Sequence, residues 1–203
     1  MIPGVTTLKT VSNASGARNS VRIIGGGWRG RRVSFPDLPG LRPTPDRVRE
    51  TLFNWLQHHI AGARCLDLFA GSGALGLEAL SRGAKELVFV EQAVAASRAL
   101  QEQLIRLGGG GRGQVVEMGA ARYLRSPPQP FDIVFLDPPF GRAALAEYVP
   151  LVDAGQWLNP GGLVYLENEK ADGVPPLPAH WTLLKSKSAG EVGYHLARVN
   201  PRV

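Results

Sequence analysis

RCLDLFAGSGALG, residues 64–76, decides the fold of this chain of 203 residues. An apolar run passes directly into a glycine-rich turn and then into alanine and leucine. Gly71, Gly73 and Gly76 satisfy the pattern G-x-G-x-x-G, in which glycines let the backbone approach a ligand at the carboxyl end of a strand. The stretch predicts a strand, a ligand-binding turn and a helix in succession.

Downstream of this stretch, β-like and helix-like segments alternate. Such alternation predicts a parallel sheet with right-handed crossovers, and the last two β-like segments predict a closing hairpin. We therefore predict a Rossmann-like α/β fold with a seven-stranded, mostly parallel sheet and an antiparallel C-terminal hairpin. The expected strands are 64–69, 86–90, 114–118, 132–136, 163–167, 181–187 and 193–199, and the expected helices are 74–81, 93–107 and 143–157.

Residues 21–60, before the alternating segments, are predicted to form a hairpin and a helix. Segments 21–24 and 32–35 are β-like and flank a glycine-rich turn, which predicts a β-hairpin. Pro45 suits the first position of a helix that runs to about residue 60, with Thr44 as its N-cap. Helical spacing predicts that this helix buries one face, made of Val48, Leu52, Trp55, Leu56 and His59.

These patterns divide the chain into three parts. We expect a flexible tail at 1–20, the hairpin and helix as a substrate element at 21–60, and a cofactor-binding catalytic domain at 61–203.

The positive charge gathers in one segment. Residues 18–49 contain eight arginines and two aspartates, a net charge of +6 that equals the formal net charge of the whole chain. A basic face on a neutral body indicates a polyanionic partner, although a merely solvated face is the plainer alternative. Because the arginines are mixed with a tryptophan and glycines, we favour nucleic acid. The candidate contacts are Arg22, Trp28, Arg29, Arg31, Arg32 and Arg42.

Two carboxylates accompany the glycine turn. Glu91 ends the second strand of the expected sheet, where it could grip ribose hydroxyls. Asp67 lies four residues before Gly71, where it would repel a diphosphate but attract the ammonium and sulfonium of a methionine moiety. This favours S-adenosylmethionine over a nicotinamide cofactor. Its candidate contacts here are Asp67, Ala70, Gly71, Gly73 and Glu91.

Asp137-Pro138-Pro139-Phe140 follows an apolar run at the same expected sheet edge. The prolines stiffen the loop and leave carbonyl acceptors. The Asp137 carboxylate and the Pro138 carbonyl could accept the two hydrogens of an exocyclic base amine, while Phe140 stacks on the base. All four residues are therefore candidate catalytic residues, Asp137 being a cofactor contact as well. A Pro-Pro loop with a hydrophobic anchor is the plainer interpretation.

Cys65 is the single cysteine and falls in a core strand. It excludes an intrachain disulfide framework and fits a reducing cytoplasm. Carbon-5 methylation of pyrimidines normally needs a free cysteine nucleophile, so the target is expected to be a base nitrogen. Metal-ligand spacing and long apolar runs are absent from the sequence. We expect a cytoplasmic monomer that binds neither metal nor membrane.

Together, residues 67–76, Glu91 and 137–140 resemble the class I, Rossmann-like S-adenosylmethionine methyltransferases that act on exocyclic amines. VRIIGGGWRGR at 21–31 and LRPTPDRVRETLFN at 41–54 are similar to the RsmD family of bacterial 16S rRNA guanine-N2 methyltransferases. The likeness runs from about residue 21 to residue 199. It implies methylation of a guanine N2 in 16S rRNA, within an assembled 30S subunit.

The resemblance also implies that the 41–54 segment packs over the cofactor and the target base. Thr44 and Arg47 then become candidates for the methionine end of the cofactor. Asp46, Arg49 and Glu50 fit a local salt-bridge network equally well.

One position departs from the family pattern. Relatives often have Asp or Asn where this chain has Gly119, at the end of the third strand. The adenine contact would then fall to the backbone of Gly119 or Ala120, or to Arg122.

Other functions remain open. An N6-adenine methyltransferase would use the same tetrapeptide. An NAD-dependent oxidoreductase is disfavoured by Asp67. A non-enzymatic RNA-binding module is disfavoured because the cofactor motif and the amine motif are both complete.

Overall fold

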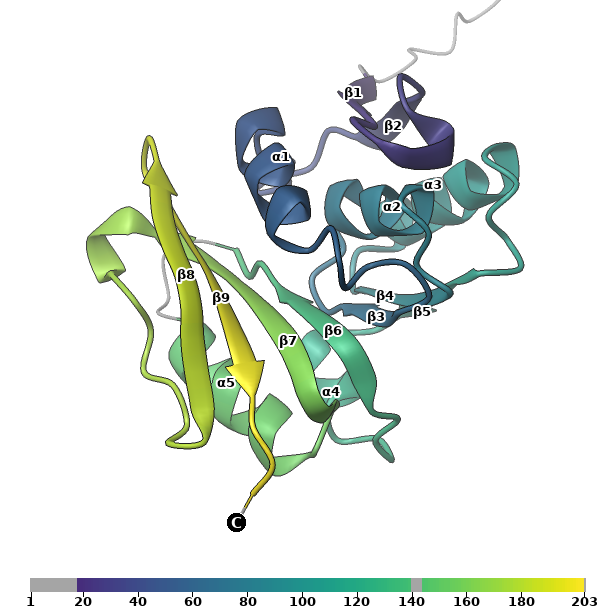
Figure 1. Ribbon diagram of the computed structural model, residues 1–203. Coiled ribbons are helices and arrows are strands. Elements are labelled where there is room, and N and C mark those ends of the chain that lie inside the picture. The colour runs from purple at the N-terminus through teal and green to yellow at the C-terminus, as the bar shows by residue number, and fades with distance from the viewer. Residues whose placement is uncertain (1–17, 140–143, 203) are drawn as a thin grey trace, which may run out of the picture.

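A seven-stranded sheet forms the centre of the computed structural model, which describes residues 18–139 and 144–202 (Figure 1). Its strand order is β5-β4-β3-β6-β7-β9-β8. The first five strands in this order are parallel, and β9 is antiparallel to both β7 and β8. The predicted sheet is confirmed. The strands are β3 (Arg64–Asp67), β4 (Glu86–Glu91), β5 (Gly113–Glu117), β6 (Phe131–Leu136), β7 (Leu158–Glu169), β8 (Trp181–Ala189) and β9 (Val192–Val199).

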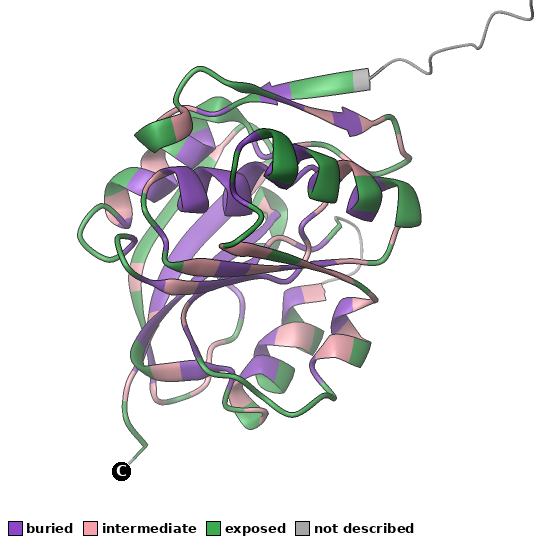
Figure 2. Ribbon diagram, turned by 90° about the vertical axis from the view of Figure 1, so that its right-hand side faces the viewer, coloured by how far each residue is buried: buried purple, intermediate pink, exposed green. Residues whose placement is uncertain are grey.

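Helices cover both faces of the sheet, and its central strands β3 and β6 are largely buried between them (Figure 2). On one face, a core cluster joins α1, α2 and α3 to residues such as Cys65 and Tyr165. On the other face, α4 and α5 pack over residues such as Leu66 and Val164. The helices are α1 (Asp46–Trp55), α2 (Ala74–Ser81), α3 (Val94–Arg106), α4 (Ala120–Tyr123) and α5 (Ala144–Ala154). Among the described helices, none is long and apolar enough to cross a membrane.

The N-terminal hairpin is confirmed, but its first strand begins earlier than predicted. Strand β1 (Arg18–Arg22) pairs antiparallel with β2 (Arg32–Pro36), so residues 18–20 belong to the hairpin. The rest of the expected tail, 1–17, lies outside the described residues. A short 3-10 helix, η1 (Gly26–Trp28), closes the turn.

Glu78, on α2, fixes the hairpin to the body of the protein. It is fully buried, and its two carboxylate oxygens accept the backbone amides of Ile24 and Gly25, each at 2.8 Å. The same carboxylate receives the guanidinium groups of Arg49 at 3.4 Å and Arg82 at 2.7 Å. These four donors offset the cost of burying the Glu78 carboxyl, which joins the hairpin, α1 and α2.

Helix α1 differs from the prediction at both ends. Its N-cap is Pro45, and the hydroxyl of Thr44 makes no capping bond. Pro45 lacks an N–H and takes the N-cap position with an extended backbone. The Thr44 side chain bonds Asp137 at the sheet instead. Beyond Trp55 the chain continues in turns, so His59 is exposed and Trp55 is only half-buried. The buried face includes Phe53 in their place.

Three smaller differences have local causes. Helix α4 was not predicted, since four residues are too short for periodicity to show. Helix α5 ends at Ala154, three residues before the predicted end, and the predicted start at residue 143 lies outside the described residues. Strand β7 begins at Leu158 rather than residue 163, because Leu158 pairs with Phe131 across a register shift.

Candidate active site

Four acidic side chains stand at the carboxyl ends of neighbouring strands. Asp67 ends β3, Glu91 ends β4, Asp137 follows β6, and Glu167 lies near the end of β7. These strands pair in parallel, so their carboxyl ends meet at one edge of the sheet (Figure 1). Ligands bind at this edge in open α/β sheets.

Asp67 is buried, and only one of its two carboxylate oxygens has a hydrogen-bond partner among the described residues. Its Oδ2 accepts the Gly76 amide at 3.0 Å, inside the first turns of α2. Its Oδ1 is buried and has no hydrogen-bond partner among the described residues. Burial, followed by the nearby charge of Asp137, raises the pKa of Asp67 to about 7. An unpaired buried acceptor is costly, so this oxygen is suited to a donor from a bound ligand.

The glycine turn is shaped by its neighbours. Gly71 and Gly73 have φ angles of 50° and 76°, the left-handed region that favours glycine. A Cβ on Gly76 would overlap the ring of Phe89, so only glycine lets α2 pack this closely on β4. The Gly71 amide donates to Glu91 Oε2 at 2.8 Å, which pins the turn to the end of β4.

Glu91 therefore has a structural task that sequence reasoning did not predict. Its Oε1 accepts the Ala93 amide at 2.7 Å, in addition to the bond from Gly71. Each carboxylate oxygen can accept about two hydrogen bonds, so acceptor capacity remains for ligand hydroxyls.

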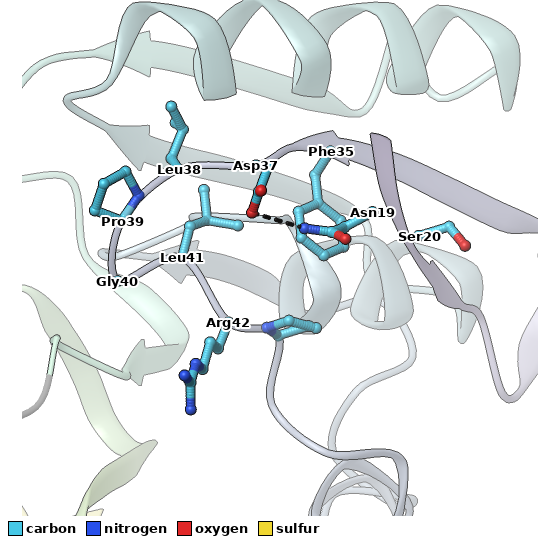
Figure 3. Close-up of a pocket in the computed structure, with 10 residues that line it drawn as sticks. Asn19, Ser20, Phe35, Asp37, Leu38, Pro39, Gly40, Leu41 and Arg42 are labelled. Atoms are coloured by element: carbon cyan, nitrogen blue, oxygen red, sulfur yellow. Dashed lines mark hydrogen bonds between the residues drawn. The ribbon is translucent and has the colours of Figure 1, made fainter. Parts of the chain in front are cut away.

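The linker between β2 and α1 passes over the glycine turn. A Cβ built on Gly71 would lie 3.9 Å from Leu41 Cγ, which is ordinary contact distance. Residues of the linker and the hairpin also line an open pocket of about 760 Å³, among them Phe35, Leu41 and Arg42. Figure 3 shows this pocket, with the Asn19–Asp37 hydrogen bond of 3.1 Å beside it.

Asp137 is hydrogen-bonded to the same linker, through Thr44. The Thr44 hydroxyl, itself buried, donates to Asp137 Oδ2 at 3.0 Å. Burial raises the pKa of Asp137 to about 6, while the Thr44 hydrogen bond opposes the rise. Pro138 is buried and Pro139 is exposed. Phe140 lies outside the described residues.

Glu167 and Tyr165 were missed by sequence reasoning. Glu167 is 3% exposed, and its Oε2 accepts the Tyr165 hydroxyl at 2.6 Å. Burial, followed by the charge of Asp137, raises the pKa of Glu167 to about 8. The available signal was an acid at the end of an apolar strand, the same signal that identified Asp67 and Asp137.

Comparison with known proteins identifies the family. Residues 21–198 match the family model Cons_hypoth95, conserved hypothetical protein 95. Ribosomal RNA small subunit methyltransferase D of Escherichia coli (strain K12) is 50% identical over 184 residues, 91% of this chain and 92% of that protein. The chain belongs to the RsmD family. The protein of the same name from Haemophilus influenzae is 45% identical, over 89% of this chain and 94% of that protein.

The solved structure of Escherichia coli yhhF matches this RsmD-family chain with a TM-score of 0.84 at 46% identity. The match covers 90% of this chain and 99% of that chain. The sheet order and the helix layers are those of class I methyltransferases, and the protein is a methyltransferase of that class.

In this RsmD-family chain, a polar side chain lies near Gly119, the position for which we expected a departure from the family pattern. A Cβ on Gly119 would lie 3.6 Å from Gln92 Oε1. Gln92, the residue after Glu91, was not among the predicted contacts. Ala120 is buried, and Arg122 is exposed. Gln92 is therefore a polar side chain beside Gly119, where the adenine contact was expected to fall to the backbone or to Arg122.

The predicted basic face of the RsmD-family chain is largely present. Arg49 is the exception, because it is buried and bonds Asp46 at 2.6 Å as well as Glu78. This supports the expected local salt bridge between Arg49 and Asp46, whereas Glu50 is exposed. Arg47 is also exposed, at the start of α1. The arginines of the predicted contact set that are exposed are Arg22, Arg29, Arg31, Arg32 and Arg42.

Trp28 differs from these arginines because it packs against the protein. It is half-buried beside the core, and the Arg112 guanidinium lies 5.3 Å from the centre of its ring. Its backbone amide donates to Ser81 on α2 at 2.9 Å. Trp28 thus anchors the hairpin turn to α2 and to the loop between α3 and β5.

Proposed function

We propose that this protein transfers a methyl group from S-adenosylmethionine to the exocyclic N2 of a guanine in 16S rRNA, within the 30S subunit. The observation that carries the proposal is the position of Asp137, whose carboxylate is oriented by Thr44 at the edge of the sheet. Asp137 directly follows β6, the strand that pairs with β3, and β3 leads into the glycine turn. The names of the relatives, which are small-subunit rRNA methyltransferases, support the RNA target.

The described residues fit the cofactor. The unpartnered Asp67 Oδ1 is an acceptor for the amino group of the methionine end. Glu91 has acceptor capacity for ribose hydroxyls, and Gly71 leaves room for close approach. Gln92, beside Gly119, is placed for the adenine. When bound, S-adenosylmethionine supplies an electrophilic methyl group.

The chain's own contribution to the reaction is positioning. An aromatic amine is a weak nucleophile because its lone pair is delocalised into the ring. Asp137 accepts a hydrogen bond from the amine, which turns the lone pair outward and stabilises positive charge as it develops on nitrogen. The same carboxylate receives the proton that the amine loses. Pro138 and Pro139 restrict the loop that holds it.

The hairpin and linker supply the RNA-binding surface in this proposal. Exposed arginines neutralise backbone phosphates and fix the orientation of the RNA without reading its sequence. Such an enzyme would work as a monomer in the cytoplasm, where ribosomal subunits are assembled.

A single experiment tests the proposal. Purified protein is incubated with methyl-labelled S-adenosylmethionine and 30S subunits that lack the modification, and the labelled nucleoside is mapped. We expect N2-methylguanosine at one site, with less product on free 16S rRNA. Label in N6-methyladenosine would replace the guanine target. Absence of transfer together with tight NADH binding would refute the proposal.

A further inference from the structure

The open pocket between the hairpin and the linker, called here the hairpin–linker pocket, has no task in the proposed reaction. Its volume of about 760 Å³ lies in the range of small-molecule sites, so it can hold a nucleotide. The described residues that line it all belong to the hairpin or the linker, and none belongs to the strands that carry the acids of the sheet edge. A ligand in this pocket is therefore a different group from the one that reacts at Asp137.

Asn19 and Asp37 supply a pair of hydrogen-bond acceptors to the pocket. The Asn19 side-chain amide donates to Asp37 Oδ1 at 3.1 Å (Figure 3). An ionised carboxylate can only accept, so this bond fixes the Asn19 amide with its nitrogen toward Asp37 and leaves its oxygen as an acceptor. The second carboxylate oxygen of Asp37 is an acceptor as well, and both residues are exposed. The pocket thus offers two neighbouring acceptors that a hydrogen bond holds together.

Two neighbouring acceptors match one RNA base. Guanine presents two adjacent donors on its Watson–Crick edge, the N1–H and the N2 amino group. Adenine and cytosine each present one amino donor beside a ring-nitrogen acceptor, and uracil presents a single N3–H between two carbonyl oxygens. Proteins read unpaired RNA bases by hydrogen bonds to this edge and by stacking on their faces. The acceptor pair therefore selects guanine.

The other lining residues suit the faces of a base. Asn19 and Phe35 are register partners across β1 and β2, so their side chains share one face of the hairpin. Phe35 is buried, while Leu41 and Pro43 are half-buried, and together they supply apolar surface. Arg42 is exposed at the pocket, where a guanidinium can stack on a base or bind its phosphate.

The charge of Asp37 supports the same occupant. Asp46, the other aspartate of the arginine-rich segment, pairs with Arg49 at 2.6 Å and with Arg22 at 3.9 Å. Within the described residues, Asp37 forms no salt bridge. An unpaired carboxylate on a surface that binds phosphates repels RNA, unless a base donates hydrogen bonds to it. Guanine donors would turn this repulsion into a favourable contact.

The pocket adjoins the amine site along the linker. Pro43 lines the pocket, and the next residue, Thr44, donates to Asp137. Leu41 also lines it, and a Cβ built on Gly71 would lie 3.9 Å from Leu41 Cγ. A base in the pocket would therefore come from a part of the RNA close to the target nucleotide.

We propose that the hairpin–linker pocket binds a second base of the RNA, an unpaired guanine close to the methylated nucleotide, through Asp37 and Asn19. This proposal rests on the proposed function for its RNA, but not for the geometry of the pocket. The contact holds the RNA equally before and during methyl transfer. It contributes to substrate binding and to sequence specificity rather than to the chemical step.

Asp37→Ala tests the proposal through the direction of its effect. If Asp37 is only a surface charge, its removal from a basic face strengthens the binding of RNA. We expect the opposite, a Kd for 30S subunits and a KM that are about 10-fold higher, as for the loss of a hydrogen bond to a charged group. The effect on kcat should be smaller, since the contact is uniform. Asp172→Ala, an exposed acid outside the pocket, is the control and should leave both constants unchanged.

The identity of the base is tested with short single-stranded RNAs that contain one guanosine, inosine or adenosine among uridines. Fluorescence anisotropy measures their affinity for Asp137→Ala, a variant in which the proposed amine site is disabled. Inosine differs from guanosine only by the missing N2 amino group, so it lacks one of the two donors. We expect guanosine RNA to bind about 10-fold more tightly than the other two, and the preference to disappear when Asp37→Ala is added. Equal affinities for the three RNAs would overturn the proposal.

Further outcomes separate this pocket from the other sites. Binding of 30S subunits by Asp37→Ala that is as tight as in the unaltered protein, or tighter, would overturn the proposal. So would a loss of S-adenosylmethionine affinity in calorimetry, because it would assign the pocket to the cofactor. Melting curves verify that Asp37→Ala is folded. If it is not, Asn19→Ala decides, since it removes one acceptor and keeps the charge.

The two proposals can fail separately. A guanosine preference that persists while no RNA is methylated would refute the proposed function and leave the pocket in place. Methylation of 30S subunits without any guanosine preference in the short RNAs would refute the pocket alone.

Discussion

Asp137 has to meet two demands at once. It must be ionised to attract the amine hydrogens, and it must lie in a place that excludes competing water. Burial raises its pKa to about 6, and the Thr44 hydroxyl opposes the rise. The carboxyl is therefore mostly ionised at neutral pH despite its position.

We predict that Asp137→Ala lowers kcat on the order of 100-fold, comparable to the loss of one preorganised electrostatic contact. KM should change less, because the contact strengthens as charge develops on the amine. Single-turnover kinetics on 30S subunits measures this, with Asp172→Ala, an exposed acid, as the control. In the unaltered protein, activity should fall as the pH drops through about 6, because Asp137 then becomes protonated. Near-normal turnover by Asp137→Ala would exclude amine anchoring.

Glu91 supports the turn and is proposed to bind the cofactor. Its removal leaves the Gly71 and Ala93 amides without their acceptor. We predict that Glu91→Ala weakens S-adenosylmethionine by about 1.5–3 kcal/mol, the range for hydrogen bonds to a charged group. Calorimetry measures the affinity, and Glu117→Ala at the end of β5 is the matched control. Unchanged affinity in the folded variant would remove Glu91 from the cofactor site.

The acids that end apolar strands were the part of the site that the sequence made visible. Asp67, Glu91 and Asp137 were predicted because each lies at the end of an expected strand, at the edge of the sheet where ligands bind. Arg49 was miscounted as part of the basic face, because its burial depends on Glu78, which lies 29 residues away in the chain. No local pattern predicts such a pairing.

At the scale of elements, the hairpin is a rigid arm on α2. The Glu78 carboxylate holds its turn, and a Cβ on Gly26 would overlap the Ser81 carbonyl, so only glycine fits this approach. The exposed arginines near the turn are thus presented on a fixed support rather than on a mobile loop.

We predict that the triple variant with Arg29, Arg31 and Arg32 changed to alanine binds 30S subunits more weakly and with a shallower salt dependence. Fewer phosphate contacts release fewer counterions, which reduces the slope of log affinity against log salt. S-adenosylmethionine affinity should stay unchanged. A variant with Arg125, Lys185 and Lys187 changed to alanine removes the same charge elsewhere and is the control. Equal slopes for the two triple variants would show that the arm is only a solvated face.

Element types were predictable, whereas some bounds were not. The predicted α2 matches residue for residue, because its glycine N-cap and alanine-leucine run are local signals. The first residues of β7 were not predicted as a strand, because Pro160 and the two glycines after it are typical of a loop. Its pairing with β6 at Leu158 is a tertiary effect that overrides local preference.

At the scale of the molecule, three buried carboxyls couple stability to pH. Burial raises the pKa of Asp67 to about 7, of Asp137 to about 6 and of Glu167 to about 8. The unfolded chain releases these protons near pH 4, so the folded protein binds more protons over the window between. The contribution of these groups to the free energy of unfolding therefore falls as the pH rises.

We predict that the protein without cofactor loses stability between pH 6.5 and pH 8.5. Urea unfolding at several pH values measures the free energy. The upper part of this window, above about pH 7.5, lies beyond the opposing effect of His195, whose pKa is lowered by burial and which destabilises the fold at more acidic pH. Glu167→Gln should flatten the dependence, because the amide does not titrate. A free energy of unfolding that rises across the window would contradict the assigned protonation of these acids.

Strand β8 forms one outer border of the sheet and has consequences for behaviour at high concentration. An outer strand offers open backbone groups to a strand from another molecule, which is how fibrous aggregates grow. Here Lys185 and Lys187 are exposed on β8, and the pairing with β9 shifts between Leu183 and Lys185. Two copies meeting border to border would bring lysines of like charge together along an irregular backbone. The like charges and the irregular backbone of β8 therefore disfavour the pairing of two copies through this border of the sheet.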